Sequence, residues 1–160
     1  MVFLFRKVAQ PVLRPLNSDR ADQCAVLHAT CFAHSWSAPE FETLLSNANV
    51  SGEAAVDPAS DDLRGFILTR LAADEAEILT IAVDGALRRR GVGRALLSGH
   101  LARLPSLGAR KLFLEVEREN VPAIALYAKF GFREVGQRPG YYRKSDGSAA
   151  TALVLRRDLL

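Results

Sequence analysis

The sequence predicts a single mixed α/β domain, in which strands and helices alternate along the chain. A length of 160 residues with 49% hydrophobic content is enough for one core and too little for two. Apolar runs at 75–83 and 111–117 are typical of strands, and Leu97, Leu101 and Leu104 between them have helical spacing. Strands joined by such a crossover helix are usually parallel, so we expect these two to be parallel neighbours.

Two helices are expected near the N-terminus. The first begins with Ser18 as its cap and ends at about Cys31. The second begins at Ser37, because Glu40 follows three residues later in the spacing of a capping box, and Pro39 fits a first helical turn.

Two further helices are expected in the second half of the chain. One runs from Gly91 to near Gly108. The other spans 121–130, with Asn120 as its cap and Gly131 just past its end. The remaining strands are expected over 11–16, 52–56, 63–72, 131–137 and 150–157. We interpret residues 1–160 as one domain, without a repeat or a linker.

Charge and hydropathy predict a cytoplasmic protein without a membrane partner. The formal net charge is only +3, because acidic residues nearly balance basic ones, so the surplus does not indicate nucleic-acid binding. The apolar start of segment 1–11 is far shorter than a signal core, and no run approaches the ~20 apolar residues of a membrane span. Cys24 and Cys31 would lie about 10 Å apart on a helix, too far for a disulfide, so we expect free thiols.

The segment Arg88-Arg-Arg-Gly-Val-Gly-Arg94 stands between a predicted strand and a predicted helix. No Gly-Lys-Ser/Thr follows it, as a Walker loop requires, and its glycines lack the spacing of a dinucleotide fingerprint. Backbone N–H groups from Arg89 to Arg94, together with the helix dipole, could instead hold a pyrophosphate that Gly91 and Gly93 let approach closely. The alternative is a solvated basic turn.

A strand ending in LTIAVD, a short loop, R-x-x-G-x-G and an amphipathic helix resemble the acetyl-CoA-binding motif of the GNAT superfamily of N-acetyltransferases. The segments FAHSWSAPEF, LTIAVDGALRRRGVGRALL, LFLEVERENVPAIALYAKFGF and GYYRK resemble, more specifically, the ribosomal-protein-alanine N-acetyltransferase group. That group comprises bacterial enzymes that acetylate the N-terminal amine of a small-subunit ribosomal protein. The resemblance covers most of residues 30–143. It implies a mixed sheet of about six or seven strands flanked by about four helices, with a parallel strand pair splayed around the cofactor.

The same resemblance implies roles for individual residues. Glu115 corresponds to the proposed general base, and Tyr127 to the proposed general acid. Acetyl-CoA is the implied co-substrate, a protein N-terminus is the implied acceptor, and no metal or direct nucleic-acid contact is expected. The implied cofactor-binding residues are Ile81, Ala82 and Val83 for the pantetheine arm and thioester, Arg88, Arg89, Arg90, Gly91, Val92, Gly93 and Arg94 for the pyrophosphate, and Asn120 near a helix start. Trp36, Tyr141 and Tyr142 are the implied substrate-binding residues.

Structural alternatives remain for these residues. Glu115 could be an exposed strand glutamate, although its apolar neighbours favour partial burial. Tyr127 could be a core aromatic with a satisfied hydroxyl, and Trp36 could be a core anchor. Tyr141 and Tyr142 could cap the sheet.

Alternative functions also remain open. Cys24, His28 and Cys31 share one helical face, but a fourth ligand is missing, so we interpret them as packing residues and expect no zinc. The acceptor could be a lysine side chain or a small amine, or the chain could be a non-catalytic acyl-CoA-binding module. Related enzymes carry acidic residues just before the last strand, where this chain has GSAATALVL and Asp146 as the only nearby carboxylate.

Overall fold

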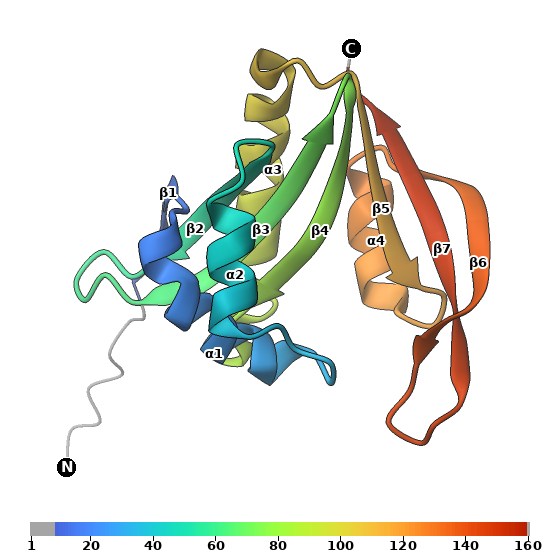
Figure 1. The fold of residues 1–160 in the computed structure, drawn as a ribbon, viewed down its shortest axis with the longest axis horizontal. Helices are drawn as coiled ribbons and strands as arrows, with labels where there is room; N and C mark the ends of the chain where they lie inside the picture. Colours follow the sequence, from blue (N-terminus) through green and yellow to red (C-terminus); the bar gives the residue numbers. More distant parts are fainter. Residues whose placement is uncertain (1–8, 160) are drawn as a thin grey trace.

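A seven-stranded mixed sheet organises residues 9–159, the part of the chain that the computed structural model describes (Figure 1). The strand order is β1-β2-β3-β4-β5-β7-β6, and only β4 and β5 pair in parallel. The strands are β1 (Val12–Pro15), β2 (Val50–Val56), β3 (Leu63–Ala72), β4 (Glu75–Val83), β5 (Lys111–Glu117), β6 (Arg133–Arg143) and β7 (Ala149–Asp158). The helices are α1 (Ala21–Cys31), α2 (Ala38–Leu45), α3 (Val92–Arg103) and α4 (Val121–Lys129), with 3₁₀ turns η1 (Ser18–Arg20), η2 (Gly85–Leu87) and η3 (Leu104–Leu107). The predicted fold class and parallel pair are confirmed.

Helices cover both faces of the sheet. Helices α1 and α2 lie against one face of the half formed by β1 to β4, and α3 and α4 lie on the opposite face (Figure 1). The core is accordingly divided into two clusters. Leu96, Leu112 and Tyr127 belong to the cluster under α3 and α4, whereas Phe41 and Phe66 belong to the cluster under α1 and α2.

A β-bulge in β4 changes the course of the central strands. Leu68 of β3 pairs with Thr80, and the next residue, Thr69, pairs with Ile78, so Leu79 is one residue in excess. A bulge bends its strand and increases the local twist.

Strands β4 and β5 pair only at their first residues. The parallel register covers Glu75–Glu77 against Lys111–Phe113, and past these residues the two strands diverge (Figure 1). We call the space between the diverging strands the fork. Its existence confirms the predicted splayed pair.

Two buried histidines flank the bulge from opposite faces. His28 of α1 has its Nε2 3.2 Å from Oγ1 of Thr80, and His100 of α3 has its Nε2 2.7 Å from Oγ1 of Thr69. The backbone N–H of Trp36 donates to Nδ1 of His28, so Nε2 of His28 carries the proton and donates to Thr80. Burial lowers the pKa of each histidine to about 4. The packing interpretation of His28 is therefore confirmed.

The helix starts follow the sequence with one exception. Ser37 accepts from the N–H of Glu40 while the Glu40 carboxylate accepts from the N–H of Ser37, which completes the predicted capping box. Ser18 was wrongly expected to cap the first helix: it lies inside η1, and α1 follows with Arg20 at its cap position and no side-chain cap bond. Arg20 is held instead by an ion pair of 2.8 Å with Asp61.

Strand β6 is longer than predicted. It runs past 137 to Arg143, although Pro139 and Gly140 interrupt its sequence pattern. The register with β7 shifts between Arg138 and Tyr142, so the proline and the glycine fall in an irregularity where no ladder bond is required.

The thiols, the helix lengths and the N-terminal segment are also the subject of predictions. Cys24 and Cys31 are free thiols, as predicted, and burial raises the pKa of Cys24 to about 12. Among residues 9–159 no helix has the length and apolar character needed to cross a membrane. Most of the segment 1–11, on which the prediction of no secretion signal rests, lies outside the described residues.

Candidate functional site

The fork places two groups of predicted site residues on its two arms. Residues 81–83, which are Ile81, Ala82 and Val83, stand at the end of β4. One edge of β4 pairs with β3 there, and the other edge no longer pairs with β5. Glu115 stands on β5, two residues past the last parallel pair. The carboxyl ends of parallel strands meet at one edge of a sheet, so both arms end on the same side of the molecule (Figure 1).

The loop that follows β4 presents a row of backbone donors. No acceptor within the described part of the chain takes the N–H of Arg89, Gly91, Val92, Gly93 or Arg94. The N–H of Arg90 is different, because it donates to the carbonyl of Leu87 at 3.3 Å. The prediction that all six groups from 89 to 94 are available is therefore wrong at Arg90 and fits the other five.

The backbone of this loop has the left-handed turns that concave donor sites need. Arg89 has φ = 61° and Gly91 has φ = 83°, and α3 begins immediately afterwards at Val92. An added Cβ at Gly93 would have Val83 at 3.7 Å as its nearest neighbour, so the protein itself leaves the space over this residue open. Alternating left-handed residues at a helix N-terminus form a nest for anions. We call residues 88–94 the anion loop.

The preceding turn is fixed by side chains. The Asp84 carboxylate accepts from the N–H of Ala86 at 3.0 Å and also pairs with Arg64 at 3.1 Å. These bonds hold the start of the anion loop in place.

The four arginines of the anion loop, Arg88, Arg89, Arg90 and Arg94, are all exposed. The guanidinium of Arg88 also lies 3.7 Å from Sγ of Cys31.

Glu115 is partly buried, as its apolar neighbours predicted. Its side chain is 15% exposed, and its Oε1 lies 3.0 Å from Nη1 of Arg138. Residues alternate across a strand, so Glu115 points to the face opposite Leu114 and Val116, which pack under α3 and α4.

Tyr127 lies on the other face of β5. It is 7% exposed within the cluster under α3 and α4, and its ring meets Phe132 edge-on with centroids 5.7 Å apart. Burial raises the pKa of Tyr127 to about 12, so its hydroxyl stays protonated at neutral pH. Glu115 and Tyr127 are thus placed on opposite faces of the sheet.

Asn120 caps α4 as predicted. Its Oδ1 accepts from the N–H of Ala123 at 3.3 Å. Its helix starts directly after β5, at the same end of the sheet as the anion loop (Figure 1).

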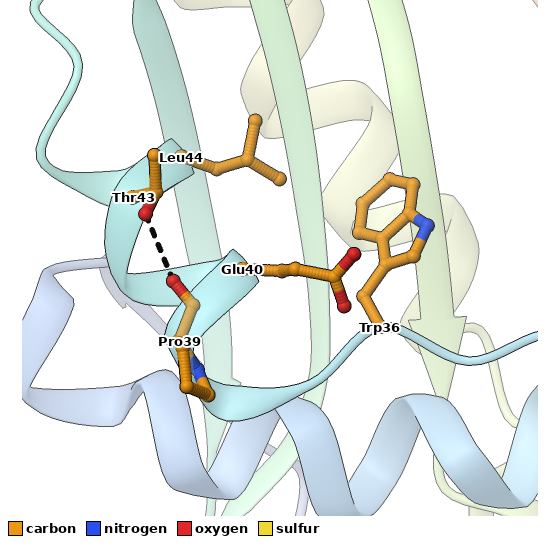
Figure 2. Close-up of a pocket in the computed structure, with 5 residues that line it drawn as sticks. All are labelled: Trp36, Pro39, Glu40, Thr43 and Leu44. Atoms are coloured by element: carbon orange, nitrogen blue, oxygen red, sulfur yellow. Dashed lines mark hydrogen bonds between the residues drawn. The ribbon is translucent and has the colours of Figure 1, made fainter.

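Trp36 belongs to an aromatic cluster. Its ring stacks on His28, with centroids 4.8 Å apart, and tilts against Phe41 at 5.5 Å. The outer side of Trp36 also borders an open hollow of about 420 Å³ on α2. Figure 2 shows its lining: Trp36, Pro39, Glu40, Thr43 and Leu44. This hollow does not include the fork or the anion loop.

The two tyrosines of GYYRK lie where the register between β6 and β7 shifts. Tyr141 is 51% exposed, and its ring lies under the guanidinium of Arg138, 5.2 Å from centroid to Cζ. Tyr142 pairs through its backbone with Ala150, and its side chain lies outside the description.

Sequence reasoning missed Arg138. The residue stands in an irregular part of β6, and its contact with Glu115 depends on the order β5-β7-β6, which no local pattern reveals. It also missed a buried polar group in which Glu53 of β2 lies 3.3 Å from Arg103 and 3.7 Å from Nδ1 of His100. Burial raises the pKa of Glu53. A glutamate within the otherwise apolar GEAAV was the available signal. No group of three potential metal-ligating side chains is found in the described range.

Comparisons with known proteins agree with this geometry. A sequence model of the acetyltransferase (GNAT) family matches residues 21–132. The [ribosomal protein bS18]-alanine N-acetyltransferase of Salmonella typhimurium is 42% identical over 89 residues, which are 56% of this chain and 60% of that protein. The chain therefore spans less than two thirds of that relative's length.

Solved structures are similar over more of the chain. The crystal structure of the ribosomal-protein-S18-alanine N-acetyltransferase from Escherichia coli has a TM-score of 0.85 and 28% identity, covering 92% of this chain and 93% of that one. Arabidopsis thaliana NAA60 in complex with acetyl-CoA has a TM-score of 0.80 and 23% identity, covering 92% and 97%. The second likeness shows the fold alone.

Proposed function

The chain belongs to the acetyltransferase (GNAT) family, and from this premise we propose that it transfers the acetyl group of acetyl-CoA to the N-terminal α-amine of a protein. As acceptor we propose a ribosomal protein that begins with alanine, because the similar enzymes of Salmonella typhimurium and Escherichia coli are alanine N-acetyltransferases of a ribosomal protein. The reaction would take place in the cytoplasm, where ribosomal proteins are made.

One observation carries the proposal: five N–H groups of the anion loop, none of which has an acceptor among residues 9–159, follow the end of β4. A diphosphate needs several converging donors, and the N-terminus of α3 adds a partial positive charge. The open space over Gly93 fits a group that approaches the backbone closely. The residues present therefore fit the diphosphate of coenzyme A. The edge of β4 at Ile81, Ala82 and Val83 would hold the pantetheine arm.

The two faces of the fork support a division of roles between acid and base. Acetyl-CoA supplies an acetyl group activated as a thioester. Glu115 accepts a proton from the incoming ammonium, which leaves a neutral amine to attack the carbonyl carbon. As the C–S bond breaks, Tyr127 donates its hydroxyl proton to the departing sulfur from the opposite face. The new amide nitrogen loses its second proton to water, and Tyr127 regains a proton from water.

The weak base favours an α-amine over lysine. An α-amine with a pKa near 8 is roughly 10% neutral at pH 7, whereas a lysine amine near 10.4 is roughly 0.04% neutral. The difference corresponds to about 3 kcal/mol, which a carboxylate base does not easily supply.

The test is a peptide panel with acetyl-CoA, read by mass spectrometry. Peptides that begin with alanine or serine should gain one acetyl group, and N-blocked peptides should gain none. The Glu115→Gln variant controls for non-enzymatic transfer. Acetylation confined to lysine would overturn the α-amine proposal. Failure of the folded protein to bind coenzyme A in a calorimetric titration would overturn the proposal that the chain is an acetyltransferase.

A lysine side chain or a small amine is the second candidate acceptor, because one carboxylate that could anchor a peptide N-terminus is bonded elsewhere. Asp146, the only carboxylate near the start of β7 in sequence, is engaged in its own turn. It accepts from the N–H of Ser148 at 2.9 Å and from its hydroxyl at 2.6 Å. The small-amine arm of the panel distinguishes this candidate, and an inactive protein that binds coenzyme A would indicate a non-catalytic acyl-CoA-binding module.

A further inference from the structure

A cation of the protein already occupies the carboxylate that the proposed reaction needs. Nη1 of Arg138 lies 3.0 Å from Oε1 of Glu115. We propose that Arg138 is an internal competitor of the acceptor, which holds Glu115 until the acceptor's α-ammonium takes its place. This inference rests on the proposed function and adds a specificity-determining residue to it.

The contact between Arg138 of β6 and Glu115 of β5 crosses the width of β7, which lies between these two strands. Arg138 pairs with Ala152 of β7, and Ala152 pairs with Glu117 of β5, so these three residues form one row on one face. Glu115 stands in the next row, opposite Val154. Neighbouring strands are about 4.8 Å apart, so the arginine reaches about 10 Å sideways over small side chains.

The irregularity of β6 next to Arg138 accounts for the direction of the Arg138 side chain. Between Arg138 and Tyr142 the strand carries three residues where β7 carries one. Gly140 in this segment has φ = 69°. Such irregularities re-aim side chains, and here Arg138 is turned toward Glu115 with the Tyr141 ring against its guanidinium.

Exposure makes the arginine the partner that can leave. The Arg138 side chain is 57% exposed, whereas that of Glu115 is 15% exposed. A displaced guanidinium regains water and keeps its contact with Tyr141. A half-buried carboxylate needs a replacement cation, and an α-ammonium supplies one with three donors.

The neighbouring carboxylates leave the arriving ammonium few other partners. Glu117 and Glu119 are both paired with Lys144, which follows β6. The β6–β7 hairpin therefore supplies a cation to each of the three carboxylates at 115, 117 and 119. An N-terminal ammonium that pairs with Glu115 competes with Arg138 for the carboxylate, whereas a peptide without a terminal charge does not compete.

The test compares peptide binding by the full chain saturated with coenzyme A, so that no transfer occurs. The Arg138→Gln variant should bind a free-amine alanine peptide about fivefold more tightly, close to the largest effect of a partly exposed ion pair. Its affinity for the N-acetylated peptide should not change. With acetyl-CoA, the KM for the free-amine peptide should fall about fivefold while kcat stays within twofold.

Two variants serve as controls. Arg133→Gln removes the same charge from the same face of β6, where the arginine pairs with Asp158 instead, and should leave both affinities unchanged. Arg138→Lys keeps a cation and should therefore keep the KM of the wild-type chain, which is higher than that of Arg138→Gln.

Other outcomes would overturn the inference. A raised KM, or a reduced kcat at unchanged KM, in Arg138→Gln would make the arginine a positioning residue for Glu115. Equal tightening of the blocked peptide would exclude competition for the ammonium. A wild-type chain that acetylates no free N-terminus would overturn the proposed function. If the wild type is active and Arg138→Gln has the same KM and peptide affinity, only the role of Arg138 as a competitor is overturned.

Discussion

Tyr127 is a packing residue to which we also assign the role of the acid. Its ring completes the cluster under α3 and α4 against Phe132, and its pKa of about 12 keeps the proton on its oxygen at neutral pH. The phenol can therefore act as an acid without ever being ionised in the resting protein.

Tyr127→Phe removes the proton and keeps the ring. We expect kcat to fall by about 10²-fold, the lower range for loss of a general acid, with the affinity for acetyl-CoA unchanged. The free energy of unfolding should change by less than about 1 kcal/mol, because the buried volume is conserved. Steady-state kinetics and urea unfolding measure the two effects, and an unchanged kcat would remove Tyr127 from the mechanism.

At the scale of elements, the anion loop joins β4 to α3 and owes its form to two glycines with different tasks. Gly91 adopts a left-handed conformation that a larger residue tolerates poorly. Gly93 is helical, and its missing side chain leaves room for a ligand.

Alanine substitutions separate these tasks. Gly93→Ala should leave the fold intact, or stabilise it by up to about 1 kcal/mol, because alanine favours a helix and meets its nearest neighbour at 3.7 Å. Its dissociation constant for coenzyme A should rise at least about tenfold, since the methyl group fills the approach to the N–H groups.

Gly91→Ala should instead lose about 1 kcal/mol of stability through backbone strain at φ = 83°. Ser98→Ala, exposed on the same helix, is the matched control: it should leave coenzyme A binding unchanged and raise stability by no more than about 0.5 kcal/mol. Calorimetric titration and thermal unfolding read the results. Unaltered coenzyme A binding by Gly93→Ala would contradict a close diphosphate at this loop.

Local patterns predicted most elements but not their irregularities. The capping box at Ser37 and the cap at Asn120 are encoded within four residues, and the structure confirms both. The extra residue at Leu79 and the contact of Arg138 with Glu115 depend on register between strands, which a sequence pattern does not contain. The roles predicted for Glu115, Tyr127 and the anion loop stay predictions.

Across the whole molecule, each face of the sheet buries one neutral histidine. His28 points from α1 toward one face of the sheet, and His100 points from α3 toward the other. Each is hydrogen-bonded to a threonine beside the bulge. Both faces of the fold therefore depend on rings that must remain uncharged.

Acid should therefore destabilise the protein. Each ring has its pKa lowered to about 4 from 6.5, so the unfolded chain binds more protons between these values. The contribution is complete above pH 6.5 and falls as pH drops, by about 2 kcal/mol for each histidine near pH 4.5. The raised pKa of Glu53 acts in the opposite direction and offsets part of the loss.

Urea unfolding at pH 7, 5.5 and 4.5 measures this effect, and NMR titration of the two rings assigns it. Rings that become charged above pH 6, or a midpoint that does not move between pH 7 and 4.5, would contradict it.

Leu79 gives β4 one residue more than its partner can match. This surplus residue comes just after Glu77, the last residue of β4 that pairs with β5. Beyond it the ladder between β4 and β5 does not continue, so the main-chain groups on that edge of β4 are the ones that the proposed ligand would address.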